Sequence, residues 1–186
     1  MNNMIDITHY PDLFAPPNWG IPVIARFELL REVPPQNLIS NINVVPFVGD
    51  KCVIIRVANT YWEMPGGTLE PDEPYLDGVR REVLEEAGAR LLDFHPFGAW
   101  DCQSQAEKPY RPHLPHPHYY RLVGYGDVEI IGAPLNPADG EQVTSVDVVT
   151  VEEAANRFHS IQRGDLADLY RLAAFLRSSK DHANGR

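Results

Sequence analysis

Several features that would assign this chain to a class of proteins are scarce or missing. It has only two cysteines, Cys52 and Cys102, whose spacing fits neither a disulfide framework nor a zinc-type cluster. It has no run of about 18 apolar residues, so no membrane-spanning helix is expected. Its first residues lack the basic-then-apolar pattern of a signal peptide. These absences favour a cytoplasmic protein with reduced thiols and no membrane partner.

Basic residues are also few relative to acidic ones. The 186 residues include 26 Asp and Glu but 16 Lys and Arg, which gives a net charge of −10. There is no dense run of lysine and arginine, so no nucleic-acid partner is expected. Hydrophobic residues make up 44% of the chain, which suits one globular domain with a sizeable core. An acidic protein that handles phosphates needs local positive charge, and bound metal ions are an obvious source.

The pattern of apolar, proline and glycine residues divides the chain into three segments. Residues 1–40 are irregular and too short to bury a core alone, so we expect an extension packed on the domain or on a homodimer partner. Residues 41–178 are expected to form the main domain, and residues 179–186 a frayed tail. Within the main domain, strands are predicted at 41–48, 51–57, 61–64, 91–100, 119–125 and 146–151, and helices at 75–87, 152–158 and 165–176.

The stretch from Gly67 to Ala89 is the most informative part of the sequence. It reads Gly67, five residues, Glu73, seven residues, and then Arg81-Glu82-Val83-Leu84-Glu85-Glu86-Ala87-Gly88-Ala89. On a helix, Glu82, Glu85 and Glu86 are three and four residues apart and therefore share one face. Three carboxylates on one face repel each other unless a cation binds them. Their hard oxygen atoms suit Mg²⁺ or Mn²⁺ and do not suit zinc.

This stretch resembles the Nudix box, whose family pattern is G-x5-E-x7-R-E-U-x-E-E-x-G-U, with U a bulky aliphatic residue. Every invariant letter of the pattern is present. The one departure is Ala89, at a packing position where the family has a larger aliphatic residue. The resemblance implies the Nudix fold, an α/β fold in which a mixed β-sheet is sandwiched between α-helices.

The resemblance also implies roles for the residues of the box. The expected metal ligands are the carboxylates of Glu82, Glu85 and Glu86 and the backbone carbonyl of Gly66. Arg81 is expected to pair with Glu73 and to hold the loop on the helix. Members of the family differ in the carboxylate that takes the proton of the attacking water. The candidates for that base are Glu82, Glu85 and the later Glu141, which could otherwise be a solvated loop residue.

The reaction that the resemblance implies is Mg²⁺- or Mn²⁺-dependent cleavage of the diphosphate in a nucleoside diphosphate linked to a group X. No subgroup motif after the box is matched. An N-terminal extension is common in dimeric members that act on ADP-ribose or nucleotide sugars, and it favours those substrates. The alternatives are a nucleoside triphosphate pyrophosphohydrolase, a non-catalytic nucleotide sensor, and a diphosphate isomerase, which would need a catalytic cysteine such as Cys52.

Aromatic and basic residues outside the box are candidates for substrate binding. Trp62 could stack on a base or pack at the edge of the domain, and Arg56 could reach phosphates or lie exposed on its strand. Residues 108–118 are interrupted by prolines, which favours a stiff surface loop that contacts substrate over one that binds metal. The candidates in this loop are Tyr110, Arg111, His113, His116 and His118.

Overall fold

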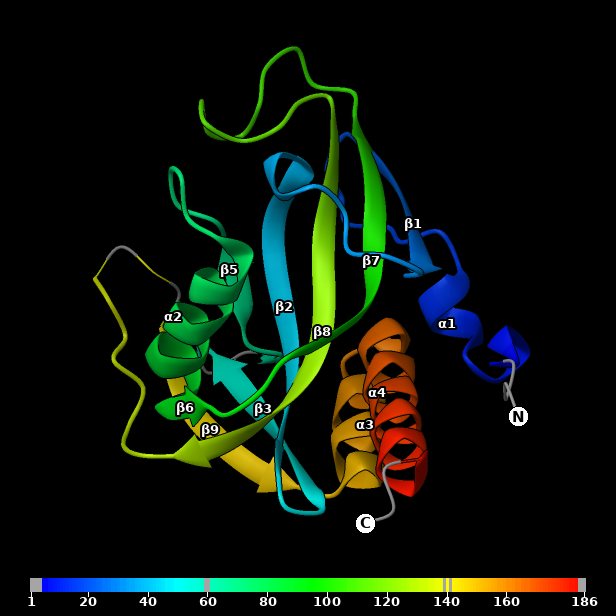
Figure 1. The fold of residues 1–186 in the computed structure, drawn as a ribbon, viewed down its shortest axis with the longest axis vertical. Coiled ribbons are helices and arrows are strands. Elements are labelled where there is room, and N and C mark those ends of the chain that lie inside the picture. The colour runs from blue at the N-terminus through cyan, green and yellow to red at the C-terminus, as the bar shows by residue number, and fades with distance from the viewer. Residues whose placement is uncertain (1–4, 59–60, 139, 141, 184–186) are drawn as a thin grey trace.

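A nine-stranded mixed β-sheet with helices on both faces forms the centre of the protein (Figure 1). The structure, a computed structural model, describes residues 5–58, 61–138, 140 and 142–183. Six strands follow one another in the order β1-β7-β8-β2-β3-β4, while β5, β6 and β9 pair with β2, β8 and β3. β2 and β8 are parallel and the other pairs are antiparallel. The α/β/α arrangement predicted from the sequence is confirmed.

The elements have the following bounds. The strands are β1 (Val23–Leu29), β2 (Ile39–Val48), β3 (Lys51–Val57), β4 (Tyr61–Glu63), β5 (Gly66–Thr68), β6 (Ala89–Leu91), β7 (His95–Ser104), β8 (His118–Ile130) and β9 (Val143–Val149). The α-helices are α1 (Pro11–Phe14), α2 (Tyr75–Ala87), α3 (Val151–Ser160) and α4 (Gly164–Ala183), and short 3-10 turns lie at Ile7–His9 and Gln36–Leu38.

The sheet separates two hydrophobic cores. On one face, the apolar side of α2 packs against β2 and β8, with Val79, Val83 and Leu122 fully buried. On the other face, α3 and α4 pack against the sheet together with the N-terminal segment (Figure 1). Tyr170 of α4 is fully buried there, and its hydroxyl donates a hydrogen bond of 2.8 Å to the Val53 carbonyl. Burial on both faces holds the sheet rigid beneath the loops that cross its edge.

Residues 5–38 pack on the domain itself. β1 pairs with β7 along its whole length, from Val23 opposite Ser104 to Leu29 opposite Gly98. The start of α1 is attached to α4, because the Asp168 carboxylate accepts hydrogen bonds from two backbone N–H groups at that end of α1. A homodimer contact through this segment remains a prediction.

Several boundaries differ from the sequence-based predictions. The strand predicted at 91–100 is two strands, β6 and β7, because the Asp93 carboxylate between them accepts a hydrogen bond of 2.7 Å from the Asp127 N–H. β5 was not predicted, since its two glycines suggest a turn. The helix predicted at 165–176 continues to Ala183, so residues 179–183 of the expected tail are helical. Helix ends are set by tertiary contacts as well as by the apolar stripe.

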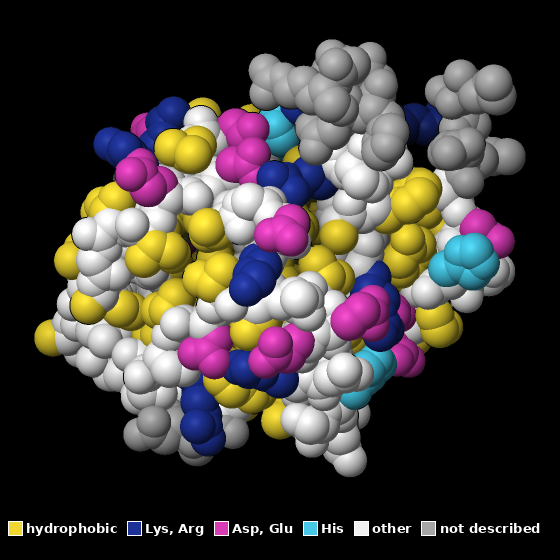
Figure 2. All heavy atoms as spheres, turned by 90° about the horizontal axis from the view of Figure 1, so that it is seen from below, with side chains coloured by type: hydrophobic (Ala, Val, Ile, Leu, Met, Phe, Trp, Pro, Cys, Tyr) yellow, Lys and Arg dark blue, Asp and Glu magenta, His cyan; other side chains and the backbone are white. Residues whose placement is uncertain are grey.

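The surface carries charges of both signs. On the face seen from below, acidic and basic side chains are interspersed with apolar ones (Figure 2). None of the helices among the described residues is both long and apolar enough to cross a membrane.

Candidate active site

A cavity of about 460 Å³ lies between the acidic side of α2 and the end of the sheet that the β7–β8 loop crosses. This volume is within the range of small-molecule binding sites. Its walls come from segments distant in the sequence: α2, the start of α4, β2, β4, β5, β7, β8, the N-terminal segment and five connections between elements. We call its α2 side the acidic end; Arg81, Glu82, Glu85 and Glu86 line it, and Glu73 is paired with Arg81. We call the side formed by Trp19, Asn41, Trp100 and Arg121 the far wall.

Local sequence fixes the direction in which α2 presents its carboxylates. Pro74 stands at the N-cap and Gly88 ends the helix in the left-handed conformation, with φ 58°. A side chain at Gly88 would lie 2.3 Å from the Gly132 carbonyl oxygen, so glycine is required there. Val79 and Val83 are fully buried against the sheet. The glutamates of the other face are therefore turned toward the cavity.

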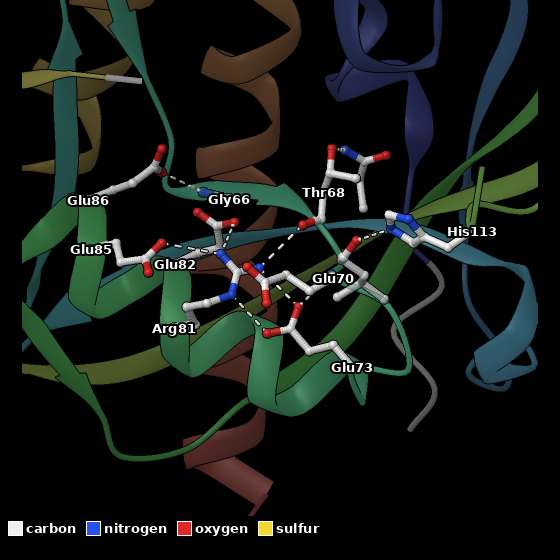
Figure 3. A network of polar contacts seen from close by, with 11 residues as sticks. Gly66, Thr68, Glu70, Glu73, Arg81, Glu82, Glu85, Glu86 and His113 are labelled. Carbon is white, nitrogen blue, oxygen red and sulfur yellow. Dashed lines mark hydrogen bonds and ion pairs between the residues drawn. The ribbon is translucent and has the colours of Figure 1, made fainter. Parts of the chain in front are cut away.

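Arg81 is the hub of the acidic end (Figure 3). Its Nε and Nη2 donate to the two carboxylate oxygens of Glu73 at 2.8 and 2.9 Å, a bidentate pair. Its Nη1 donates to Glu82 at 2.7 Å and to Glu85 at 3.2 Å, and Nη2 also reaches the Thr68 carbonyl at 3.2 Å. Although burial acts to raise it, hydrogen bonds from Arg81 and from the Glu70 N–H hold the pKa of Glu73 below its usual value. Arg81 thereby joins the loop after β5 to the helix.

Glu82 is the most buried carboxylate of the acidic end, with 7% of the residue exposed. Its Oε1 lies so close to Gly67 that a Cβ at that position would be 2.2 Å away, so only glycine leaves it room. Burial raises the pKa of Glu82, Arg81 opposes this shift, and the neighbouring Glu85 and Glu73 add to it. A cation beside Glu82 would favour the charged form of this buried carboxylate, as Arg81 already does.

Glu86 lies one helical turn from Glu82 and contacts β5. Its Oε2 accepts a hydrogen bond of 2.9 Å from the Gly66 N–H, so its carboxylate is held against the glycine turn (Figure 3). Gly66, Glu82, Glu85 and Glu86 all line the cavity. The residues expected as metal ligands therefore all border the same cavity.

The donor set of the acidic end fits a hard divalent cation. All of its side-chain donors are carboxylate oxygens, the ligands that Mg²⁺ prefers. Among the described residues, no three Asp, Glu, His or Cys side chains are positioned around one point as metal ligands. A cation nevertheless already lies between Glu82 and Glu85, namely the Arg81 guanidinium. A divalent ion at this site would share these two carboxylates with Arg81.

The far wall is a row of residues across neighbouring strands. Trp100 of β7 lies opposite Arg121 of β8, Arg121 lies opposite Asn41 of β2, and Asn41 lies opposite Thr68 of β5. The Asn41 amide donates to the Thr68 hydroxyl at 3.0 Å, so the row ends at the residue whose carbonyl Arg81 binds. The row thus connects the acidic end to the opposite side of the cavity.

Two connections close the cavity on its other sides. Tyr110 and Arg111 of the β7–β8 loop line it, and His113 of the same loop contacts the Leu69 carbonyl at 2.9 Å. Between α3 and α4, Arg163 is paired with Glu63 of β4 and with Asp165. These ion pairs fix the wall formed by β4, while the β7–β8 loop extends over the entrance.

Some predicted site residues lie elsewhere. Trp62 packs between the guanidinium groups of Arg56 and Arg157, with Cζ 5.6 and 4.6 Å from its ring. His118 contacts Asp101 at 2.9 Å, and His116 contacts the Ala106 carbonyl at 2.9 Å. Neither Arg56, Trp62 nor His118 is among the described residues that line the cavity.

Two further predictions concern Glu141 and Cys52. Glu141 falls outside the described residues. Cys52, required for the isomerase alternative, is fully buried in β3, where burial raises the pKa of its thiol to about 12. A thiol with so high a pKa is not a ready nucleophile at neutral pH.

The far wall was not predicted from the sequence. Trp19, Trp100 and Arg121 come from three separate segments, and only the register of β7, β8 and β2 places two of them side by side. An arginine in an apolar strand, as in 119–125, is the only local signal that could have pointed to one of them.

Comparison with known sequences identifies relatives of the part of the chain that contains α2 and most of the sheet. A sequence model of the NUDIX domain matches residues 38–169. The m7GpppN-mRNA hydrolase NUDT17 of Bos taurus is 36% identical over 77 residues, which are 38% of this chain and 24% of that protein. A MutT-like protein of Streptomyces ambofaciens is 46% identical over 59 residues, which are 31% of this chain and 38% of that protein. The chain thus matches less than half the length of these curated relatives.

Solved structures share the fold. The Bacillus subtilis pyrophosphohydrolase BsRppH aligns with a TM-score of 0.51 at 21% identity, over 67% of this chain and 71% of its own. A NUDIX hydrolase from Nitrosomonas europaea aligns with a TM-score of 0.50 at 18% identity, over 70% of this chain and 87% of its own. At these identities the likeness concerns the fold alone.

Proposed function

Since this chain belongs to the NUDIX domain family, we propose that it is a hydrolase that cleaves the diphosphate of a nucleoside diphosphate joined to a group X. Members of the family generally use divalent metal ions, and we propose Mg²⁺ or Mn²⁺ here. The observation that carries the proposal is the gathering of Glu82, Glu85 and Glu86 beside Gly66 at one end of the cavity.

The residues of the acidic end have separable tasks. Glu82, Glu85 and Glu86, with the Gly66 carbonyl, would hold the metal ion. When bound, such an ion withdraws charge from the diphosphate and makes water more acidic. Arg81 orients Glu82 and Glu85 by hydrogen bonds, and the Gly66 N–H orients Glu86.

The general base is proposed among the same carboxylates. Glu85 is the more accessible candidate, because 24% of its side chain is exposed, against 9% for Glu82. A base must reach the proton of the attacking water, so exposure to the cavity favours Glu85. Glu141 is the third candidate.

A more specific proposal concerns the group X that is joined to the nucleoside diphosphate. Packing of residues 5–38 on the domain is compatible with the ADP-ribose or nucleotide-sugar preference that the N-terminal extension suggests. A second candidate is a substrate with a longer phosphate chain, such as a nucleoside triphosphate. One relative is an m7GpppN-mRNA hydrolase, whose substrate has a longer phosphate chain. Two basic side chains that line the cavity, Arg121 of the far wall and Arg111 of the β7–β8 loop, also favour such a substrate. A sensor that binds without cleavage would not need the full set of carboxylates.

A substrate panel tests the proposal. Purified protein with Mg²⁺ or Mn²⁺ is incubated with ADP-ribose, nucleotide sugars, diadenosine polyphosphates, a capped dinucleotide and nucleoside triphosphates, and products are separated by chromatography. Metal-dependent release of a nucleoside monophosphate, lost in Glu86→Gln and kept in the exposed-site control Glu28→Gln, is expected. Tight binding of one compound without turnover would favour the sensor.

A further inference from the structure

Arg121 presents a guanidinium to the cavity that the described residues leave without a counter-ion. Its Nε is buried and has no hydrogen-bond partner, and none of the ion pairs among described side chains includes it. An arginine stays charged at neutral pH. Arg121 is partly buried, and a partly buried charge without an ion pair destabilises the folded protein, so such groups are candidates for functional sites.

The surroundings of Arg121 position the guanidinium without an ion pair, because the nearby carboxylate of Glu63 is itself paired with Arg163. The Trp19 ring lies 4.7 Å from its Cζ, a cation–π contact that fixes one face of the group. Trp19 in turn meets Trp100 edge to face, with ring centroids 6.0 Å apart. The guanidinium is thus held against an aromatic ring, and Arg121 lines the cavity.

The ligand that fits this guanidinium brings hydrogen-bond acceptors and negative charge. The guanidinium carries five N–H donors, and none of the hydrogen bonds among the described residues uses one of them. Donors without acceptors call for oxygen atoms from the ligand. The unpaired positive charge makes a phosphate group a better match than a neutral nucleobase, because guanidinium binds phosphate by charge-assisted hydrogen bonds.

The position of Arg121 places this phosphate away from the bond that is cleaved. Arg121 is two strands from Thr68, and at the usual strand spacing their Cα atoms are roughly 10 Å apart. We propose that Arg121, supported by Trp19, is a specificity-determining residue of a subsite that binds a further phosphate of the substrate, beyond the scissile diphosphate. The proposal rests on the proposed function and narrows X to groups that carry phosphate.

The subsite joins the N-terminal segment to the family domain. Trp19 lies before residue 38, where the match to the NUDIX domain begins, whereas Trp100 and Arg121 lie inside it. The packing of β1 on β7 and of α1 on α4 holds the segment that carries Trp19. A role in substrate selection would therefore give the N-terminal segment a function beyond stability.

Paired substrates test the subsite. ADP-ribose and ADP-ribose phosphorylated on its distal ribose share the nucleoside and the scissile diphosphate and differ in one phosphate. We expect wild type to prefer the phosphorylated compound in kcat/KM, and Arg121→Gln to reduce that preference by on the order of tenfold to hundredfold, through KM. Arg121→Lys should retain part of the preference. Arg90→Gln is the charge-matched control and should keep the whole preference, because Arg90 of β6 is exposed and pairs with Glu129 at the end of β8.

The results that would contradict the Arg121 subsite differ from those that would contradict the proposed hydrolase function. Cleavage of both compounds with the same ratio in wild type and Arg121→Gln would overturn the subsite and leave the proposed function standing. A preference that follows the identity of the nucleobase, and not the number of phosphates, would also overturn it. Failure of wild type to cleave any compound would refute the proposed function alone.

A binding measurement tests the subsite even if wild type cleaves no compound or a variant folds poorly. Inorganic tripolyphosphate is titrated into the protein in EDTA, and tryptophan fluorescence is followed. Saturable binding that is weakened in Arg121→Gln and Trp19→Phe, and kept in Arg90→Gln, supports the subsite without requiring turnover. Absence of saturable binding to wild type would overturn it.

Discussion

Arg81 and Arg121 line opposite ends of one cavity, and only Arg81 is neutralised by the protein. Arg81 donates five hydrogen bonds, four of them to carboxylates of Glu73, Glu82 and Glu85. Arg121 contacts an aromatic ring, and its Nε finds no acceptor among the described residues. The hydrogen bonds to Glu73 help to raise the pKa of Arg81, whereas burial lowers the pKa of Arg121. The same residue type therefore stabilises the structure at one end and stays available at the other.

This difference gives the cavity two complementary ends. At the acidic end, four glutamates surround one arginine, which leaves negative charge for a divalent cation. At the far wall, the Arg121 Nε has no acceptor and the guanidinium has no ion pair among the described residues, which favours an anion there. A substrate with several phosphates satisfies both ends, because a metal ion joins it to one end and direct hydrogen bonds join it to the other.

The largest expected effect is on catalysis at the acidic end. Glu82→Gln removes a negative charge from the proposed metal site, and kcat should fall about 10³-fold, roughly 4 kcal/mol of activation free energy. Steady-state kinetics with Mg²⁺ measure it, with the exposed β1 residue changed in Glu28→Gln as control. Full metal-dependent turnover by Glu82→Gln would remove Glu82 from the site.

The next effect is on stability at the same end. Arg81→Gln leaves Glu73 and Glu82 without their common partner, and the free energy of unfolding should fall by about 3 kcal/mol, as for breaking a buried ion pair. Urea unfolding without metal measures it. The neighbouring Arg80→Gln is a matched control, because Arg80 pairs with Asp77 on the exposed side of α2 and should cost less than about 1 kcal/mol. Equal losses in the two variants would show that Arg81 has no special structural role.

A third effect links the metal to the acidic end. Mg²⁺ that binds only the folded protein, at about 100 times its Kd, should raise the free energy of unfolding by about 2.7 kcal/mol. Glu82→Gln should lose most of this gain at the same Mg²⁺ concentration, and EDTA should reverse it in wild type. Thermal unfolding measures the shift, and an equal gain in the variant would place the ion elsewhere.

The two ends also differ in how far the sequence predicts them. The acidic end lies within one helix and the loop before it, so helical spacing predicts that Glu82, Glu85 and Glu86 share a face. The resemblance to the Nudix box implies the pair of Arg81 with Glu73. The far wall depends on parallel pairing of β2 with β8, strands from distant parts of the chain, and on a proline-rich segment that carries Trp19. No local pattern fixes such a pairing or its register.

The dependence on contacts between distant segments also explains where the observed strand bounds differ from the predicted ones. The α/β/α layers were implied by the resemblance to the Nudix family, and α2 has the predicted bounds because its cap and apolar stripe are local. Strand ends were less predictable, since the break between β6 and β7 depends on a hydrogen bond from Asp127 of another strand to Asp93. Contacts between distant segments placed Trp62 and His118 away from the cavity as well.

The smallest expected effect is the change in the free energy of unfolding when Arg121 of the far wall is replaced, which can be compared directly with the effect of replacing Arg81. Arg121→Gln breaks no ion pair among the described residues, and it loses a cation–π contact worth about 0.5–1 kcal/mol. Removal of an unpaired buried charge offsets that loss, so the free energy of unfolding should change by less than about 1 kcal/mol. Urea unfolding beside Arg81→Gln measures the contrast. A loss as large as that of Arg81→Gln would assign Arg121 a structural role, since a residue kept for its ligand contributes to binding and not to the stability of the free protein.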